Sequence, residues 1–111
     1  MKTIKIIIVV ILAIVITSTV YSQSVTSKTE TLKVSGNCDM CKARIEKAAK
    51  VDGVTKAEWN KKDKMLAVTF NPAKTNIDAI GKKIAAAGHD NDKAKATKAT
   101  YDKLPSCCLY R

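Results

Sequence analysis

The chain has few of the residues that build large cores or catalytic centres. Aromatic side chains make up 5% of its 111 residues, with a single Trp and a single Phe, so the core is small and a second domain does not fit. There is one histidine, the acidic residues stand apart from one another, and no glycine-rich phosphate loop or serine-nucleophile motif occurs. These absences argue against an enzyme.

The chain also lacks an apolar run long enough to cross a bilayer, which takes about 20 residues. Its longest run, residues 6–16, has 11 residues, follows Lys2 and Lys5 and precedes small, hydroxylated residues. This pattern is typical of a secretory signal peptide rather than of an uncleaved anchor. We expect residues 1–22 to be the signal peptide, cleaved after Ser22 or Ser24, and residues 23–28 to be an N-terminal linker. The mature protein is then periplasmic or secreted, without a stable membrane anchor.

Acidic residues are half as numerous as basic ones, ten against twenty, which gives a formal net charge of +10. Removal of the signal peptide takes Lys2 and Lys5 away and leaves +8. Such a surplus suits nucleic acid, but the lysines are spread along the whole chain as on an ordinary solvated surface. Exported proteins also meet little nucleic acid, so we expect no nucleic-acid partner. The charge is better interpreted as a field that attracts an acidic protein or an anionic membrane.

Strands and helices alternate in the mature part of the chain. Period-two apolar patterns predict strands at residues 29–35, 54–60 and 65–70. A short fourth strand at residues 89–95 would complete a split βαβ arrangement. Helical spacing predicts a helix at residues 40–50, with Asp39 as its N-cap, and a second helix that starts at Thr75 or Asn76 and ends at Gly88. This order is that of an α+β, ferredoxin-like βαββαβ sandwich, an antiparallel sheet with two helices on one face.

A small set of apolar side chains forms the expected core of this sandwich. The helices should pack their apolar stripes against the alternating residues of the first and third strands, which are Leu32, Val34, Leu66, Val68 and Phe70. The opposite face of the sheet then remains wet and carries Lys and Thr.

Cys38 and Cys41 form a Cys-x-x-Cys motif between the first expected strand and the first helix. With ARIEKA at residues 43–48 and VDGV at residues 51–54, the motif resembles the heavy-metal-associated domain family. The resemblance covers roughly residues 29–95, which we take as the domain. Family members include soluble copper chaperones, modules of copper-exporting ATPases and the periplasmic mercuric-ion-binding protein. A signal peptide followed by one domain is closest in architecture to that last member or to a secreted copper chaperone.

The resemblance implies that Cys38 and Cys41 bind the metal. The family usually reads Gly-Met-x-Cys-x-x-Cys, with the Met as a buried packing residue, whereas Gly36 stands at that place here. The rigidity of the loop and its metal preference therefore depend on what replaces the Met. Met40, inside the motif, either turns inward as the substitute or stays exposed.

The chemistry of the two thiols agrees with this resemblance. Metals bind thiolates, and a helix N-terminus favours negative charge. Two soft thiolates on a short loop suit near-linear coordination of Cu(I) or Hg(II), whereas Zn(II) prefers four ligands in a tetrahedron. We expect Cu(I) first, with Hg(II) or Zn(II) as alternatives, and a membrane metal transporter or its metal-binding domain as partner.

Three other residues are additional candidate ligands. The end of the second helix returns to the sheet edge that carries the Cys-x-x-Cys, and some bacterial family members place a histidine there, as His89 is placed here. A histidine in solvent is the alternative. The tail, residues 96–111, lies outside the resemblance and carries Cys107 and Cys108, which either share the metal or form disulfides. Residues 97–103 favour a short helix that packs Tyr101 and Leu104 on the domain.

Two functions of other classes remain open. A Cys-x-x-Cys at a helix start also occurs in thiol-disulfide redox proteins, although Asn37, Asp39 and Met40 stand where thioredoxin-like sites carry an aromatic residue and a proline. The other is an interaction module stabilised by disulfides, because export exposes thiols to oxidation. Four cysteines admit three pairings, and spacing does not choose among them.

Overall fold

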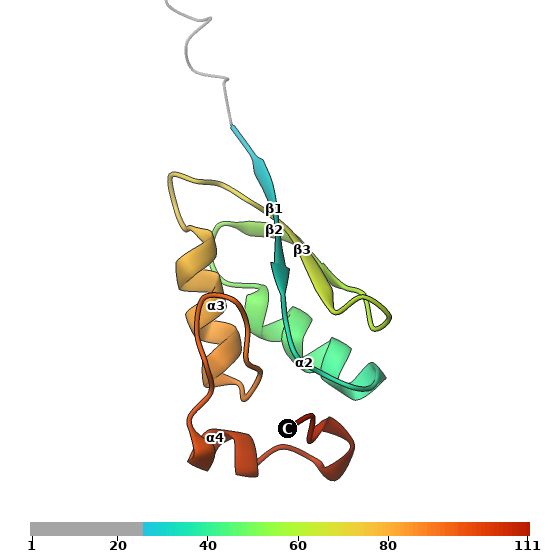
Figure 1. Cartoon of the computed structure of the whole chain (residues 1–111). Helices are drawn as coiled ribbons and strands as arrows, with labels where there is room; N and C mark the ends of the chain where they lie inside the picture. Colours follow the sequence, from blue (N-terminus) through green and yellow to red (C-terminus); the bar gives the residue numbers. More distant parts are fainter. Residues whose placement is uncertain (1–25) are drawn as a thin grey trace, which may run out of the picture.

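The computed structural model describes residues 26–111. The expected signal peptide, residues 1–22, and half of the expected linker, residues 23–28, lie outside the described residues. No helix in residues 26–111 has the length and apolarity needed to cross a membrane. Figure 1 shows the order of the elements, which are β1 (Lys28–Lys33), α2 (Asp39–Ala49), β2 (Val54–Trp59), β3 (Met65–Phe70), α3 (Ile77–Ala86), α4 (Lys98–Asp102) and the 3-10 turn η2 (Ser106–Cys108).

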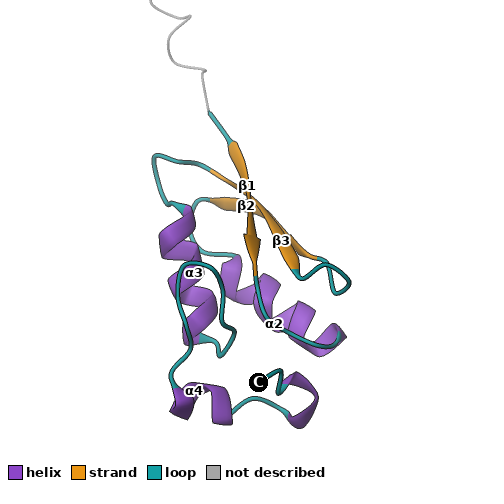
Figure 2. Cartoon of the chain, viewed as in Figure 1, coloured by secondary structure: helices purple, strands orange, loops and turns teal. Residues whose placement is uncertain are grey.

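The three strands form one antiparallel sheet in the order β1-β3-β2. Helices α2 and α3 lie side by side and cover one face of this sheet (Figure 2). The expected ferredoxin-like arrangement, a sheet with two helices on one face, is confirmed. Because β1 and β2 both run antiparallel to β3, the loop before α2 and the loop after α3 meet at one end of the molecule.

The expected fourth strand at residues 89–95 is wrong. Within residues 26–111 the segment makes a single antiparallel bridge, between Val34 and Asn91. The Asn91 side chain explains the difference, because its Oδ1 accepts hydrogen bonds from the amides of Lys93 and Ala94 at 3.0 and 3.2 Å. The Asn91 amide also donates to the Ala94 carbonyl at 2.9 Å. These local bonds bend the segment into a turn, so that it touches the edge of β1 and then leaves it.

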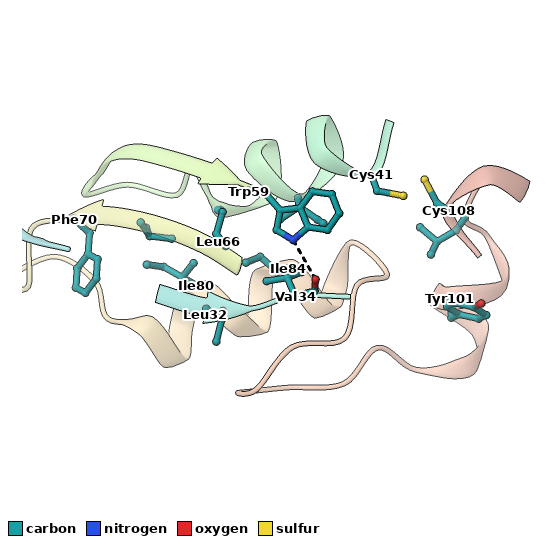
Figure 3. Packing of buried hydrophobic residues seen from close by; sticks show 14 residues of the cluster. Leu32, Val34, Cys41, Trp59, Leu66, Phe70, Ile80, Ile84, Tyr101 and Cys108 are labelled. Atoms are coloured by element: carbon teal, nitrogen blue, oxygen red, sulfur yellow. Dashed lines mark hydrogen bonds between the residues drawn. The ribbon is translucent and has the colours of Figure 1, made fainter. Parts of the chain in front are cut away.

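The core lies between the helices and the sheet (Figure 3). All five residues expected in it are confirmed as buried, and each buried aliphatic or aromatic side chain of this size contributes about 1.5–3 kcal/mol of transfer free energy. The residues less than 2% exposed include Leu32, Val34, Cys41, Ile45, Trp59, Leu66, Val68, Phe70, Ile80 and Ile84.

The two main helices start differently from one another. Asn76 caps α3 as predicted, because its Oδ1 accepts from the Ala79 amide at 2.8 Å. For α2 the prediction is wrong: Cys38 is the N-cap, with φ −136° and ψ 176°, and Asp39 is the first helical residue. No side chain caps α2, so the free amides of its first turn face the thiol of its own N-cap residue.

Candidate metal centre

The Cys-x-x-Cys motif places two sulfurs side by side at the start of α2. Cys38 is half-buried at the N-cap, and Cys41 is fully buried on the first turn. Residues three apart on a helix lie on the same face, and the two Sγ atoms are accordingly 3.4 Å apart. One side of the pair is closed by the core, and Cys38 provides the access from solvent.

The position of Cys38 favours its thiolate. The nearby backbone amide of Cys41 favours the charged form of this sulfur, burial opposes it, and the neighbouring thiols of Cys41, Cys107 and Cys108 favour it further. Together they lower the pKa of Cys38 to about 7. A nucleophilic sulfur that could serve as a metal ligand is thus available near neutral pH.

Trp59 packs against Gly36, the residue that stands where the family usually carries Met. A Cβ at Gly36 would lie 3.1 Å from Cys41 Cβ and 3.1 Å from the Trp59 ring atoms. The indole Nε1 donates to the Val34 carbonyl at 3.1 Å, which fixes the ring against the loop (Figure 3). Met40 stays exposed, at 51%, and does not turn inward, whereas Trp59 from β2 is buried beside Gly36.

The C-terminal tail brings a third sulfur to the motif. Figure 1 shows the tail passing beyond the end of α3 to the start of α2, and η2 contacts α2 there. Cys108 is 0% exposed and its Sγ lies 3.8 Å from Cys38 Sγ. The Sγ atoms of Cys38, Cys41 and Cys108 all lie within 4.8 Å of one another, and we call them the three-sulfur group.

Cys107, the neighbour of Cys108, points the other way. It is exposed, its Sγ lies 3.7 Å from Met40 Sδ and 4.0 Å from Cys108 Sγ, and it is outside the three-sulfur group. All four cysteines are free thiols. The neighbouring Cys38 thiol raises the pKa of Cys107, and burial raises that of Cys108.

A short helix and a polar clamp hold the tail in place. As predicted, a short helix, α4, forms here, and Tyr101 on it and Leu104 after it pack on the domain. Leu104 fills the space beside Gly88, whose φ is +109°. The Tyr110 hydroxyl donates to the Gly88 carbonyl and accepts from the Asp90 amide, both at 2.7 Å. The loop after α3 therefore fixes the segment that carries Cys108.

The clamp ends in an ion pair between the last residue and the same loop. Arg111 donates through Nη2 to Asp90 Oδ1 at 2.9 Å and through Nε to Oδ2 at 3.2 Å. Burial acts to raise the pKa of Asp90, but the Arg111 guanidinium and the Ala96 amide outweigh it and hold that pKa below its usual value. The pattern Leu-Tyr-Arg directly after two cysteines is the only sequence signal that marks this clamp.

His89 lies at the expected end of the sheet but outside the three-sulfur group. It is completely buried, and its Nδ1 donates a hydrogen bond to the Ser35 carbonyl at 2.8 Å. Its ring stacks on Tyr110 with 5.7 Å between centroids, and its buried Nε2 has no hydrogen-bond partner among the described residues. Burial lowers the pKa of His89 and so favours its neutral form. Through Ser35 and Tyr110 the ring links the clamp to the loop before α2, residues 34–38, which we call the metal loop.

The fold and the site together define a class of protein: a small metal-binding module that presents soft sulfur ligands at one end of a ferredoxin-like sandwich. The model of the heavy-metal-associated domain matches residues 31–90, and the chain belongs to that family. Heavy-metal-associated domains are metal-binding modules of the chaperone type. Membership therefore shows a metal-binding domain, consistent with the sulfur site described above.

Three proteins with related sequences or structures are similar to this chain. The mercuric transport protein periplasmic component of Shewanella putrefaciens is 44% identical over 64 residues, which cover 56% of this chain and 70% of that protein. A copper-exporting P-type ATPase of Staphylococcus saprophyticus is 37% identical over 84 residues, 72% of this chain and 11% of the ATPase. The crystal structure of oxidised MerP from Ralstonia metallidurans has a TM-score of 0.57 and 35% identity, and covers 60% of this chain and 96% of MerP.

Proposed function

We propose that this protein carries one soft metal ion on Cys38 and Cys41 and passes it to the thiols of a membrane metal transporter. The observation that carries the proposal is the pair of sulfurs 3.4 Å apart at the start of α2, one of them half-buried and favoured as a thiolate. Soft thiolates select soft ions, and the half-buried position of Cys38 lets an incoming thiolate reach the ion. In each exchange step one metal–sulfur bond forms as another breaks.

Cu(I) is the first cargo that we propose, and Hg(II) is the second. Both accept the low coordination numbers that two or three thiolates supply. Similarity to a copper-exporting ATPase supports Cu(I), and similarity to a mercuric transport protein supports Hg(II). Zn(II) ranks below both, because it prefers four ligands.

Export to the periplasm or to the outside of the cell is part of the proposal. It rests on the apolar run at residues 6–16 behind Lys2 and Lys5. The name of the Shewanella relative, a periplasmic component, supports it. An acceptor with its own exposed Cys-x-x-Cys, such as the metal-binding domain of a transporter, fits the exchange chemistry.

A transfer experiment tests this function. The reduced protein, loaded with one equivalent of Cu(I), is mixed with the isolated metal-binding domain of a copper-exporting ATPase, the two are separated, and copper is measured in each. We expect the copper to redistribute between them, and Cys107→Ser to behave as the parent because its thiol lies outside the three-sulfur group. Retention of all copper by the loaded protein would count against a carrier, and failure to load would count against the site.

A further inference from the structure

Cys108 is a buried thiol that has no role in the function proposed above, which uses only Cys38 and Cys41. It lies 70 residues from Cys38 in the sequence, yet their Sγ atoms are 3.8 Å apart. Figure 3 shows the sulfurs of Cys41 and Cys108 facing each other from α2 and from the tail. A buried free cysteine is often only a small apolar packing residue. Here, however, its sulfur faces two sulfurs of a metal motif.

The tail contacts fix this sulfur on both sides. The Cys108 amide donates to the Pro105 carbonyl at 2.8 Å, which closes η2. The side chain of Asn37, the residue before Cys38, donates through Nδ2 to the Leu109 carbonyl at 3.0 Å. The tail is thus tied directly to the metal loop at the residue that follows Cys108, and the clamp of Tyr110 and Arg111 continues from there.

The spacing of the sulfurs suits three ligands better than two. With metal–sulfur bonds of about 2.3 Å, three sulfurs in a planar triangle lie about 4.0 Å apart, and two sulfurs in a line lie about 4.6 Å apart. The Cys38 sulfur is 3.4 Å from that of Cys41 and 3.8 Å from that of Cys108, and the third separation is within 4.8 Å. A linear site on Cys38 and Cys41 alone would require the pair to open by more than about 1 Å.

We propose that Cys108 is a third thiolate ligand, delivered by the tail, which converts the two-sulfur motif into a three-coordinate site. This inference rests on the proposed function, because Cys38 and Cys41 supply the other two sulfurs. The third ligand closes the ion off from water and disfavours release to small thiols. Transfer to an acceptor then requires the tail to give up one bond, Cys108 to metal, as the acceptor thiolate forms its own.

The test is X-ray absorption at the mercury edge, on the reduced full chain loaded with one equivalent of Hg(II), which counts the sulfurs bound to the ion. We expect three sulfurs in the parent, two in Cys108→Ser, and three in Cys107→Ser, the matched control one residue away. Cys108→Ala, which keeps an apolar side chain in the core, should also give two. Circular dichroism of each variant shows that the fold is intact.

Release of the ion gives a second measurement with a kinetic readout. We expect Cys108→Ser and Cys108→Ala to lose Cu(I) to a dithiol competitor faster than the parent by at least the roughly 10- to 100-fold that loss of an outer-shell partner costs, and Cys107→Ser to match the parent.

The outcomes separate this inference from the proposed function. Two sulfurs in the parent, with binding retained, would overturn the third ligand and leave the carrier on Cys38 and Cys41 intact. The third ligand would also be overturned if the parent and Cys108→Ser both bound mercury through two sulfurs and only Cys38→Ser/Cys41→Ser failed to bind it. Absence of mercury from the reduced parent would overturn both.

Discussion

Two individual side chains, Cys38 and Trp59, determine the properties of the metal loop. Cys38 is the N-cap of α2, so the amides of the first helical turn stabilise its negative charge. The Trp59 ring packs against Gly36 so closely that a side chain at position 36 would collide with it. The motif alone predicts the two adjacent sulfurs, because residues three apart on a helix meet. It does not predict Trp59, whose contact with Gly36 depends on how β2 packs.

Cys38 should be the reactive thiol of the ion-free, reduced protein. Because the pKa of Cys38 is lowered to about 7, its alkylation by iodoacetamide should rise with pH to a midpoint near 7. Cys107, whose pKa is raised, should react only above its ordinary range although it is more exposed. Mass spectrometry of the peptides after short exposures at a series of pH values measures both. Faster labelling of Cys107 at pH 7 would contradict the assignment.

Gly36→Ala should destabilise the protein. The new Cβ would meet Cys41 Cβ and the Trp59 ring at 3.1 Å, and the buried indole is held by its bond to Val34. Overpacking of this kind costs about 1–3 kcal/mol. Urea denaturation of the parent and the variant measures the difference. The same change made beside Trp59→Phe should cost less, because the smaller ring lacks the contacting atoms. An equal cost in both backgrounds would exclude a contribution of the Trp59 ring.

At the scale of elements, the segment after α3 departs most from expectation. The expected βαββαβ order suggested a strand at residues 89–95, but the Asn91 side chain accepts from the amides of Lys93 and Ala94, and the chain turns away from β1. Instead of pairing with β1, the loop after α3 contacts the tail: Asp90 binds Arg111, and the Gly88 carbonyl accepts a hydrogen bond from Tyr110. Hydrophobic periodicity cannot show whether these residues form a turn or a strand, because both structures accept the same pattern of polar and apolar residues.

The ion pair of Asp90 and Arg111 should stabilise the protein at neutral pH and lose that effect in acid. The pKa of Asp90 is lowered in the folded state, so its contribution is complete above the ordinary carboxyl value of 3.8 and disappears as the pH falls through the lower, folded value. Urea denaturation of the parent and Arg111→Gln at pH values between 7 and about 2 measures it. We expect the parent to be more stable at pH 7, and the difference to shrink below pH 3.8.

A surface ion pair provides the control for this measurement. Lys98 and Asp102 form an exposed pair one turn apart on α4, with the Lys98 side chain 86% exposed, and such pairs contribute little. Lys98→Gln should therefore leave stability unchanged across the same pH range. A difference between parent and Arg111→Gln that grows in acid would contradict the role of Asp90.

At the scale of the whole molecule, the tail and the domain act as one structure. The element order and the helix-covered sheet follow from periodicity, because each strand and helix buries its own apolar face. The sequence also offers Cys107 and Cys108 as candidate ligands, but it does not choose between them, because Cys38 and Cys108 meet only through contacts made 70 residues apart. The folded chain brings the sulfur of Cys108, and not that of Cys107, to the motif.

The positive charge of the whole chain should accelerate its encounter with an acidic acceptor. The formal net charge is +10, or +8 without Lys2 and Lys5, and salt screens such attraction over about 10 Å at 0.1 M. The rate of Cu(I) transfer to an acidic metal-binding domain, followed by stopped flow, should fall as salt rises. A rate independent of salt would show that charge does not guide the encounter.

The most direct measurement of the central claim is a titration of the reduced protein with Cu(I) against a chromophoric chelator, beside Cys38→Ser/Cys41→Ser and Cys107→Ser. The account predicts tight one-to-one binding by the parent and by Cys107→Ser, and none by the double variant. Binding that survives in the double variant, or a parent that takes no Cu(I) from the chelator, would contradict a soft-metal site on Cys38 and Cys41.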